Sequence, residues 1–85
     1  MAVASPSPTP NPDAIKFTLD IKLPGSINFA GAEAAADNAF ATEVFGLGGV
    51  AAVFGVNDFV TITRIPGSDW DPIVSGVVAA AATHL

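Results

Sequence analysis

The chain has 85 residues, 51% of them apolar and 13% charged, with a formal net charge of −5. This length fits a single domain. Nucleic acids and anionic membrane surfaces are bound through clustered cations, so with only three Lys and Arg neither is expected as a partner. Because the chain has no cysteine, disulfides, zinc–thiolate sites, iron–sulfur ligation and thiol catalysis by this chain alone are excluded.

The N-terminal residues lack the features of common targeting signals. They have neither the basic region nor the apolar region of a secretory signal, and they have no Arg of the kind that mitochondrial presequences contain. No run without a polar residue, residues 76–82 among them, reaches the roughly 20 residues that a bilayer requires. We therefore expect a small acidic domain located in the cytoplasm.

Prolines dominate the first stretch of the chain. They alternate with small polar residues at four positions: Pro6, Pro8, Pro10 and Pro12. Each proline removes a backbone donor and pushes the preceding residue into extended geometry. Polyproline II repeats every three residues, so prolines spaced by two do not share one face and a proline-rich docking peptide is disfavoured. We predict a flexible Pro/Ser-rich arm over residues 1–8 and a single domain over residues 9–85.

The clearest periodicity runs from Ile15 to Leu23, where apolar and polar residues alternate. Period two with one apolar face predicts a half-buried strand. Pro24-Gly25 then fits a turn, because Pro suits its second position and Gly accepts positive φ at its third. Residues 26–29 are expected to form a short partner strand.

Residues 33–47 predict a helix. This stretch is rich in Ala, and Phe40, Val44 and Leu47 follow at helical spacing. The glycines at 46, 48 and 49 invite comparison with a phosphate-binding loop. Such loops precede a helix, whereas these glycines follow one, so they are better explained as a helix C-cap.

Residues 50–56 and 59–65 predict a hairpin. The link is Asn57-Asp58, and both residues tolerate the left-handed conformation that a tight turn requires. In this register one face carries Val53, Val60 and Ile62. The other face carries Phe54, Val56 and Phe59.

The last element is a helix from about Trp70 to Thr83, capped by Ser68, Asp69 or Asp71. Asp71 would place Pro72 at the first helical position, where its missing N–H is harmless. The element order is strand-strand-helix-strand-strand-helix. It predicts an α+β, two-layer sandwich with an antiparallel-rich four-stranded sheet and both helices on one face.

The side chains give little basis for enzymatic chemistry. The only imidazole, His84, is next to the C-terminal residue, and no G-x-S-x-G motif occurs. Asp69 and Asp71 flank Trp70, but without a third acidic neighbour they are better explained by helix capping than by metal binding. We expect no catalytic activity, no bound metal and no cofactor.

A partner-binding surface is the remaining prediction. Phe54, Val56 and Phe59 are expected on the sheet face that the helices leave open, where adjacent large apolar groups commonly mark interaction sites. The proline-ordered segment Thr9, Pro10, Asn11 and Pro12 leads into the first strand and is expected to border the same region. The alternative is that Phe59 packs against the sheet edge or the N-terminal arm as part of the core.

Several runs of sequence together resemble one protein family. They are T-P-N-P-D-A-I-K-F (residues 9–17), A-F-A-T-E-V-F-G-L-G-G-V (39–50), V-F (53–54), D-F-V-T-I-T (58–63) and D-W (69–70). Their order and spacing resemble the N-terminal domain of the Nfu/NifU-type iron–sulfur cluster scaffold proteins. The resemblance spans nearly the whole chain.

The resemblance implies the fold predicted above and a role beside a cluster-binding unit. In full-length proteins of the family, a separate domain with a C-x-x-C pair holds the cluster, and no residue here inherits that role. The resemblance therefore implies a non-catalytic protein-interaction module, accessory to iron–sulfur cluster assembly or delivery. Its partners would be iron–sulfur assembly proteins or acceptor apoproteins. The alternative is a free-standing small binding domain of unrelated role.

Overall fold

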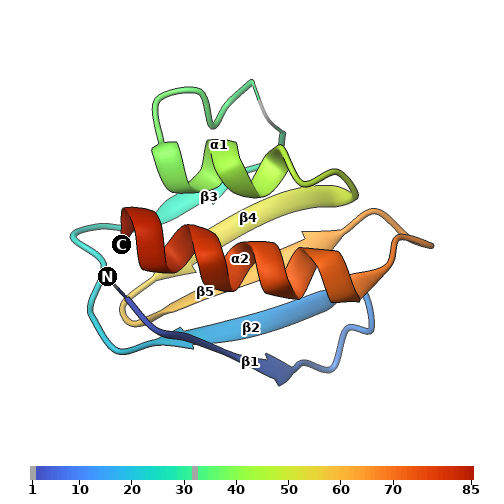
Figure 1. The fold of residues 1–85 in the computed structure, drawn as a ribbon, viewed down its shortest axis with the longest axis horizontal. Coiled ribbons are helices and arrows are strands. Elements are labelled where there is room, and N and C mark those ends of the chain that lie inside the picture. Colours follow the sequence, from blue (N-terminus) through green and yellow to red (C-terminus); the bar gives the residue numbers. More distant parts are fainter. Residues whose placement is uncertain (1, 32) are drawn as a thin grey trace.

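The computed structural model describes residues 2–31 and 33–85; residue 1 of the predicted arm lies outside the described residues. The elements are β1 (Ala4–Pro8), β2 (Ala14–Leu19), β3 (Ile27–Phe29), α1 (Ala39–Phe45), β4 (Val50–Val56), β5 (Phe59–Arg64) and α2 (Trp70–His84). The strands form one antiparallel sheet in the order β1-β2-β5-β4-β3. Both helices pack on the same face of this sheet (Figure 1), as the sequence predicted.

The predicted count of four strands is wrong, because β1 adds a fifth. It pairs with β2 from Ala4↔Leu19 to Pro8↔Ile15, within the segment that the sequence assigned to a flexible arm. Prolines are compatible with a strand at the edge of a sheet, because alternate backbone positions there need no donor. The flexibility of residues 1–8 stays a prediction.

The predicted pairing of the first two strands is also wrong. β3 pairs with β4, at the far edge of the sheet from β1. Both edges of β2 are already occupied, by β1 and β5, so no place beside it remains for β3. The end of β2 and the residues after it are held instead by the β4–β5 turn. Leu19 N–H donates to Asp58 O, and Leu23 N–H donates to Asn57 O.

The hairpin prediction is confirmed. β4 and β5 pair in the expected register, with Val56 opposite Phe59, Gly55 opposite Val60 and Val53 opposite Ile62. Asn57 has a φ of 56°, the left-handed conformation that the turn requires.

Helix α1 is shorter than the predicted range of 33–47. Its N-cap is Asn38, whose side-chain oxygen accepts a hydrogen bond from Ala41 N–H at 3.0 Å. Capping side chains of this kind compete with helix continuation, so the Ala-rich residues before Asn38 form turns. The helix ends at Gly46, and Gly48 and Gly49 follow with φ near +80°, which supports the C-cap interpretation of the glycine run.

Helix α2 agrees with the predicted helix of residues 70–83. The N-cap is Asp69, the second of the three candidates, and Pro72 therefore lies third in the helix and not first. Its missing N–H is still one of the first four that have no partner within a helix. Among the described residues, no helix combines the length and apolar character that crossing a bilayer requires.

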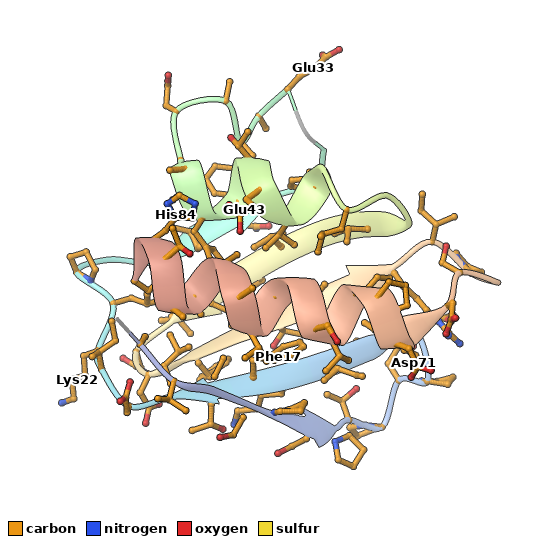
Figure 2. The ribbon with its side chains drawn as sticks, viewed as in Figure 1. Phe17, Lys22, Glu33, Glu43, Asp71 and His84 are labelled. Carbon is orange, nitrogen blue, oxygen red and sulfur yellow. The ribbon has the colours of Figure 1, made fainter. Side chains whose placement is uncertain are left out.

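The core lies between the helices and the sheet. Its largest fully buried side chains are Phe17, Phe40, Val44, Val53, Val60, Ile62, Ile73 and Val77. Phe17 lies beneath α2 in Figure 2. The two helices pack side by side. Helix α1 contacts β4, and helix α2 contacts β1. The opposite face of the sheet has no helix over it, and we call it the helix-free face.

Candidate functional site

Three apolar side chains meet on the helix-free face, as the hairpin register predicted. Phe54 and Val56 come from β4 and Phe59 from β5, at alternating positions that point away from the core. The ring centroids of Phe54 and Phe59 are 6.4 Å apart and the rings are tilted by 51°. This distance is within the range of favourable aromatic pairs, so the three residues form one patch.

The members of this patch differ in exposure. Phe54 is 40% exposed, whereas Val56 and Phe59 are half-buried. Lys16 on β2 shields Phe59, with its Nζ 4.4 Å from the ring centroid, in a cation–π contact. Phe59 is thus covered by a neighbouring strand's side chain on the same face, and Phe54 is the part of the patch that remains accessible.

The sheet carries no negative charge. Its five strands contain two charged residues, Lys16 and Arg64, and both are basic. Every acidic residue lies in a turn, loop or helix: Asp13, Asp20, Glu33, Asp37, Glu43, Asp58, Asp69 and Asp71. On the helix-free face the strands therefore contribute one charged side chain, Lys16, and the carboxylate next to the patch in sequence is that of Asp58 in the β4–β5 turn.

The predicted site segment of Thr9, Pro10, Asn11 and Pro12 forms the β1–β2 turn. Thr9 Oγ1 lies 2.9 Å from Asn11 O and 3.0 Å from Ala14 O, and it accepts from Asn11 N–H. The indole N–H of Trp70 donates to Pro12 O at 3.4 Å. These bonds hold the turn against the start of α2.

The structure does not bring this turn and the apolar patch together. Ala14, just after the turn, is paired with Thr63, while Phe59 is paired with Thr18 at the other end of β2. The two groups of predicted site residues therefore lie at opposite ends of the strands. They form separate surfaces, not one.

A groove beside the turn is a feature that the sequence analysis did not find. It has a volume of about 470 Å³ and lies between β1, the β1–β2 turn and the first turns of α2. Its apolar lining includes Pro6, Pro8, Pro12, Ile15, Trp70 and Val74. The period-two prolines were the available signal, because in a strand they place Pro6 and Pro8 on the same face as Phe17.

Several titratable side chains make packing and capping contacts. His84 Nε2 lies 3.0 Å from Glu43 Oε1, and the pair joins the end of α2 to α1 (Figure 2). Asp69 Oδ1 accepts from Asp71 N–H at 3.2 Å, as an N-cap does. Within residues 2–31 and 33–85, no three His, Cys, Asp or Glu side chains gather closely enough to hold a metal ion.

Comparisons of this chain with family models and with known proteins lead to the same family. The model of the family described as "Scaffold protein Nfu/NifU N terminal" matches residues 5–85. A NifU-like protein of Schizosaccharomyces pombe is 32% identical over 91% of this chain and 31% of its own length. The mitochondrial NFU1 iron-sulfur cluster scaffold homolog of Drosophila grimshawi is 38% identical over 84% of this chain. The chain spans only about a quarter to a third of the length of these relatives.

Solved structures agree with the fold. A Staphylococcus aureus protein determined by crystallography matches with a TM-score of 0.80 and 27% identity, over 94% of this chain and 98% of that one. A NifU-like protein of Saccharomyces cerevisiae matches with a TM-score of 0.81 over 98% of this chain and 77% of that one. Its identity is 22%, so this second match supports the fold alone.

Proposed function

Because this chain belongs to the Nfu/NifU N-terminal family, we propose that it is a non-catalytic protein-interaction module that is accessory to iron–sulfur cluster assembly or delivery. Its partners in this proposal are iron–sulfur assembly proteins or the apoproteins that accept clusters. Relatives named as iron-sulfur cluster scaffold proteins support the pathway. The observation that carries the binding role is the Phe54–Phe59 pair on the helix-free face.

The side-chain chemistry does not fit direct ligation of a cluster. Clusters are held mainly by Cys thiolates, and this sequence has none. A single His, paired with Glu43, does not make a ligand set. In the proposal the cluster is therefore cargo that another protein holds, and this domain contributes contacts between proteins. No catalytic step is assigned to it.

The apolar patch of Phe54, Val56 and Phe59 is the proposed primary contact. An accessible aromatic ring beside two half-buried apolar side chains is typical of the centre of a protein interface. The absence of carboxylates from the strands supports this choice, because little charge has to be desolvated when an apolar partner surface covers the patch. Thr9, Pro10, Asn11 and Pro12 are proposed as a second contact surface, separate from the first.

A cytoplasmic location is part of the proposal. The word "mitochondrial" in the names of the fly and plant relatives describes those proteins.

Affinity capture from a lysate, followed by identification of the bound proteins, tests the pathway. The proposal expects iron–sulfur enzymes or cluster-assembly factors to be enriched over a capture with an unrelated acidic domain of similar size. Capture of a reproducible set that contains no such protein would favour the alternative, a small binding domain of unrelated role.

A further inference from the structure

We propose that the groove between β1, the β1–β2 turn and the start of α2 binds an extended peptide segment that combines apolar side chains with a Lys or Arg. The groove opens on the helix side of the sheet, away from the Phe54–Phe59 patch. The groove includes Thr9, Asn11 and Pro12 of the second contact surface proposed above, and the inference states what that surface binds. It does not depend on which proteins the helix-free face binds.

The apolar part of the groove suits short aliphatic side chains. Pro6 and Pro8 pair with Phe17 and Ile15, so their rings face the helix side, where β1 and α2 diverge. Trp70 and Val74 form the opposite wall. A volume of about 470 Å³ lies within the size range of ligand-binding clefts, and it would hold a few residues of an extended chain.

The backbone of β1 beside the groove offers acceptors and few donors. Leu19 N–H donates to Asp58 O in the β4–β5 turn, on the side of β2 that faces β5. By alternation the amides of Lys16 and Thr18 point toward β1. Their partners Ser7 and Ser5 therefore direct their own N–H and C=O groups at β2. Pro6 lies between Ser5 and Ser7, and Pro8 follows Ser7. Both prolines direct their carbonyls away from β2, and neither has an N–H.

The shortage of backbone donors along the outer edge of β1 favours some ligands over others. A strand that added to β1 would need donors at the positions of Pro6 and Pro8, so extension of the sheet is disfavoured. The outward carbonyls lie in the plane of the sheet, at the edge beside the groove. They suit a ligand group that only donates hydrogen bonds and reaches over that edge. Lys ammonium and Arg guanidinium groups are such donors.

The charges around the groove also favour a cation. Asp71 is the one charged residue in the lining, and among the described residues no ion pair engages its carboxylate. The guanidinium of Arg64 lies 5.3 Å from the ring centroid of Trp70, but it is paired with Asp13 at 3.1 Å and donates to Ser68 O at 2.8 Å. With a net charge of −5, the whole chain would add to the attraction of a basic peptide.

The groove is already ordered before any ligand binds. The hydrogen bonds of Thr9 hold the turn, and Trp70 Nε1 ties the turn to α2. A pre-formed site avoids the entropic cost of ordering on binding. The same indole provides a signal, because Trp70 is the only tryptophan in the chain.

The experiment titrates the 85-residue chain with the synthetic peptide acetyl-Pro-Leu-Arg-Leu-Pro-amide and with the same peptide carrying Glu in place of Arg. Binding is followed by Trp70 fluorescence and by ¹⁵N NMR shifts of the Trp70 indole and the Val74 amide. We expect saturable binding of the Arg peptide, at least about tenfold tighter than that of the Glu peptide.

Two variants that each remove one negative charge show whether the carboxylate in the groove is the one that attracts the Arg peptide. Asp71→Asn should weaken binding of the Arg peptide by about fivefold, since a partly exposed ion pair is lost. Glu33→Gln, on the loop before α1 and far from Asp71 in Figure 2, should leave the affinity unchanged. Equal affinities for the two peptides, equal effects of the two variants, or no saturable binding would overturn the proposal.

A third variant separates this proposal from the proposed function. Phe54→Ser should leave binding of the Arg peptide unchanged, because Phe54 is on the other face of the sheet. NMR shifts confined to the Phe54 and Phe59 region would mean that the peptide binds the helix-free face, and the groove assignment would then be wrong.

Discussion

Arg64 and Asp13, 51 residues apart in the chain, are joined through both their side chains and their backbones. Arg64 Nε lies 3.1 Å from Asp13 Oδ1, and Arg64 N–H donates to Asp13 O at 2.8 Å. The same guanidinium donates to Ser68 O and lies 5.3 Å from the ring centroid of Trp70. One arginine at the end of β5 thus ties the β1–β2 turn to the start of α2.

The first prediction follows from this set of contacts. Arg64→Lys should lower the free energy of unfolding by about 1–2 kcal/mol, because a lysine cannot reproduce the planar, multiply donating guanidinium. Chemical denaturation monitored by circular dichroism measures the change. Lys22→Arg, at an exposed position, is the control and should have no effect. An unchanged midpoint for Arg64→Lys would show that these contacts are not maintained in solution.

The second prediction concerns the core. Phe17 is fully buried on β2, and Phe17→Ala should destabilise the protein by about 3–5 kcal/mol through lost burial and the cavity left behind. Phe54→Ala removes the same side-chain atoms from a 40% exposed position and should have a smaller effect. If Phe17→Ala left the denaturation midpoint in place, the assigned register of β2 would be incorrect.

The third prediction compares two glycines. A Cβ built at Gly55 would lie 2.9 Å from side-chain atoms of Ile27, Leu23 and Val60, whereas one at Gly25 meets nothing within 4 Å. Gly55→Ala should therefore destabilise the protein by about 1–3 kcal/mol through overpacking. Gly25→Ala should be neutral or slightly stabilising. Thermal unfolding of both variants makes the comparison, and equal melting temperatures would contradict the packing of β3 against β4.

The fourth prediction concerns the exposed edge of the sheet. Pro6→Ala would give the outer edge of β1 a new N–H beside the neighbouring carbonyls. We expect the variant to stay folded but to self-associate more readily than the wild type, because an edge with both donors and acceptors can pair with another strand. Sedimentation velocity over a range of concentrations measures this. The same monomer content for variant and wild type would argue against the protective role of the prolines.

The hairpin and the last helix were predictable because their signals are local. Asn57-Asp58 specifies a two-residue turn, which fixes the opposition of Val56 and Phe59. The spacing of apolar residues after Trp70 and the acidic caps before it define α2. The Phe54, Val56 and Phe59 patch followed from the same register and was therefore predicted with it.

The errors arose where distant parts of the chain compete. The pairing of β3 with β4 depends on β1 and β5 occupying both edges of β2, which no local pattern reveals. β1 was missed because alternating prolines disfavour a central strand, although an edge strand tolerates them. The groove beside Trp70 depends on that strand, so it was missed as well.

If the helix-free face is the primary surface through which this domain binds its partners, Phe54→Ser should prevent their capture. Captures with wild type, Phe54→Ser, Val56→Ser and the control Ile21→Ser are compared, each variant first checked for retained fold by circular dichroism. Ile21 is 37% exposed, close to the 40% of Phe54, and lies outside the patch. We predict that Ile21→Ser captures the wild-type set of proteins and that Phe54→Ser and Val56→Ser lose most of it. Folded Phe54→Ser and Val56→Ser variants that capture the full wild-type set would contradict the claim.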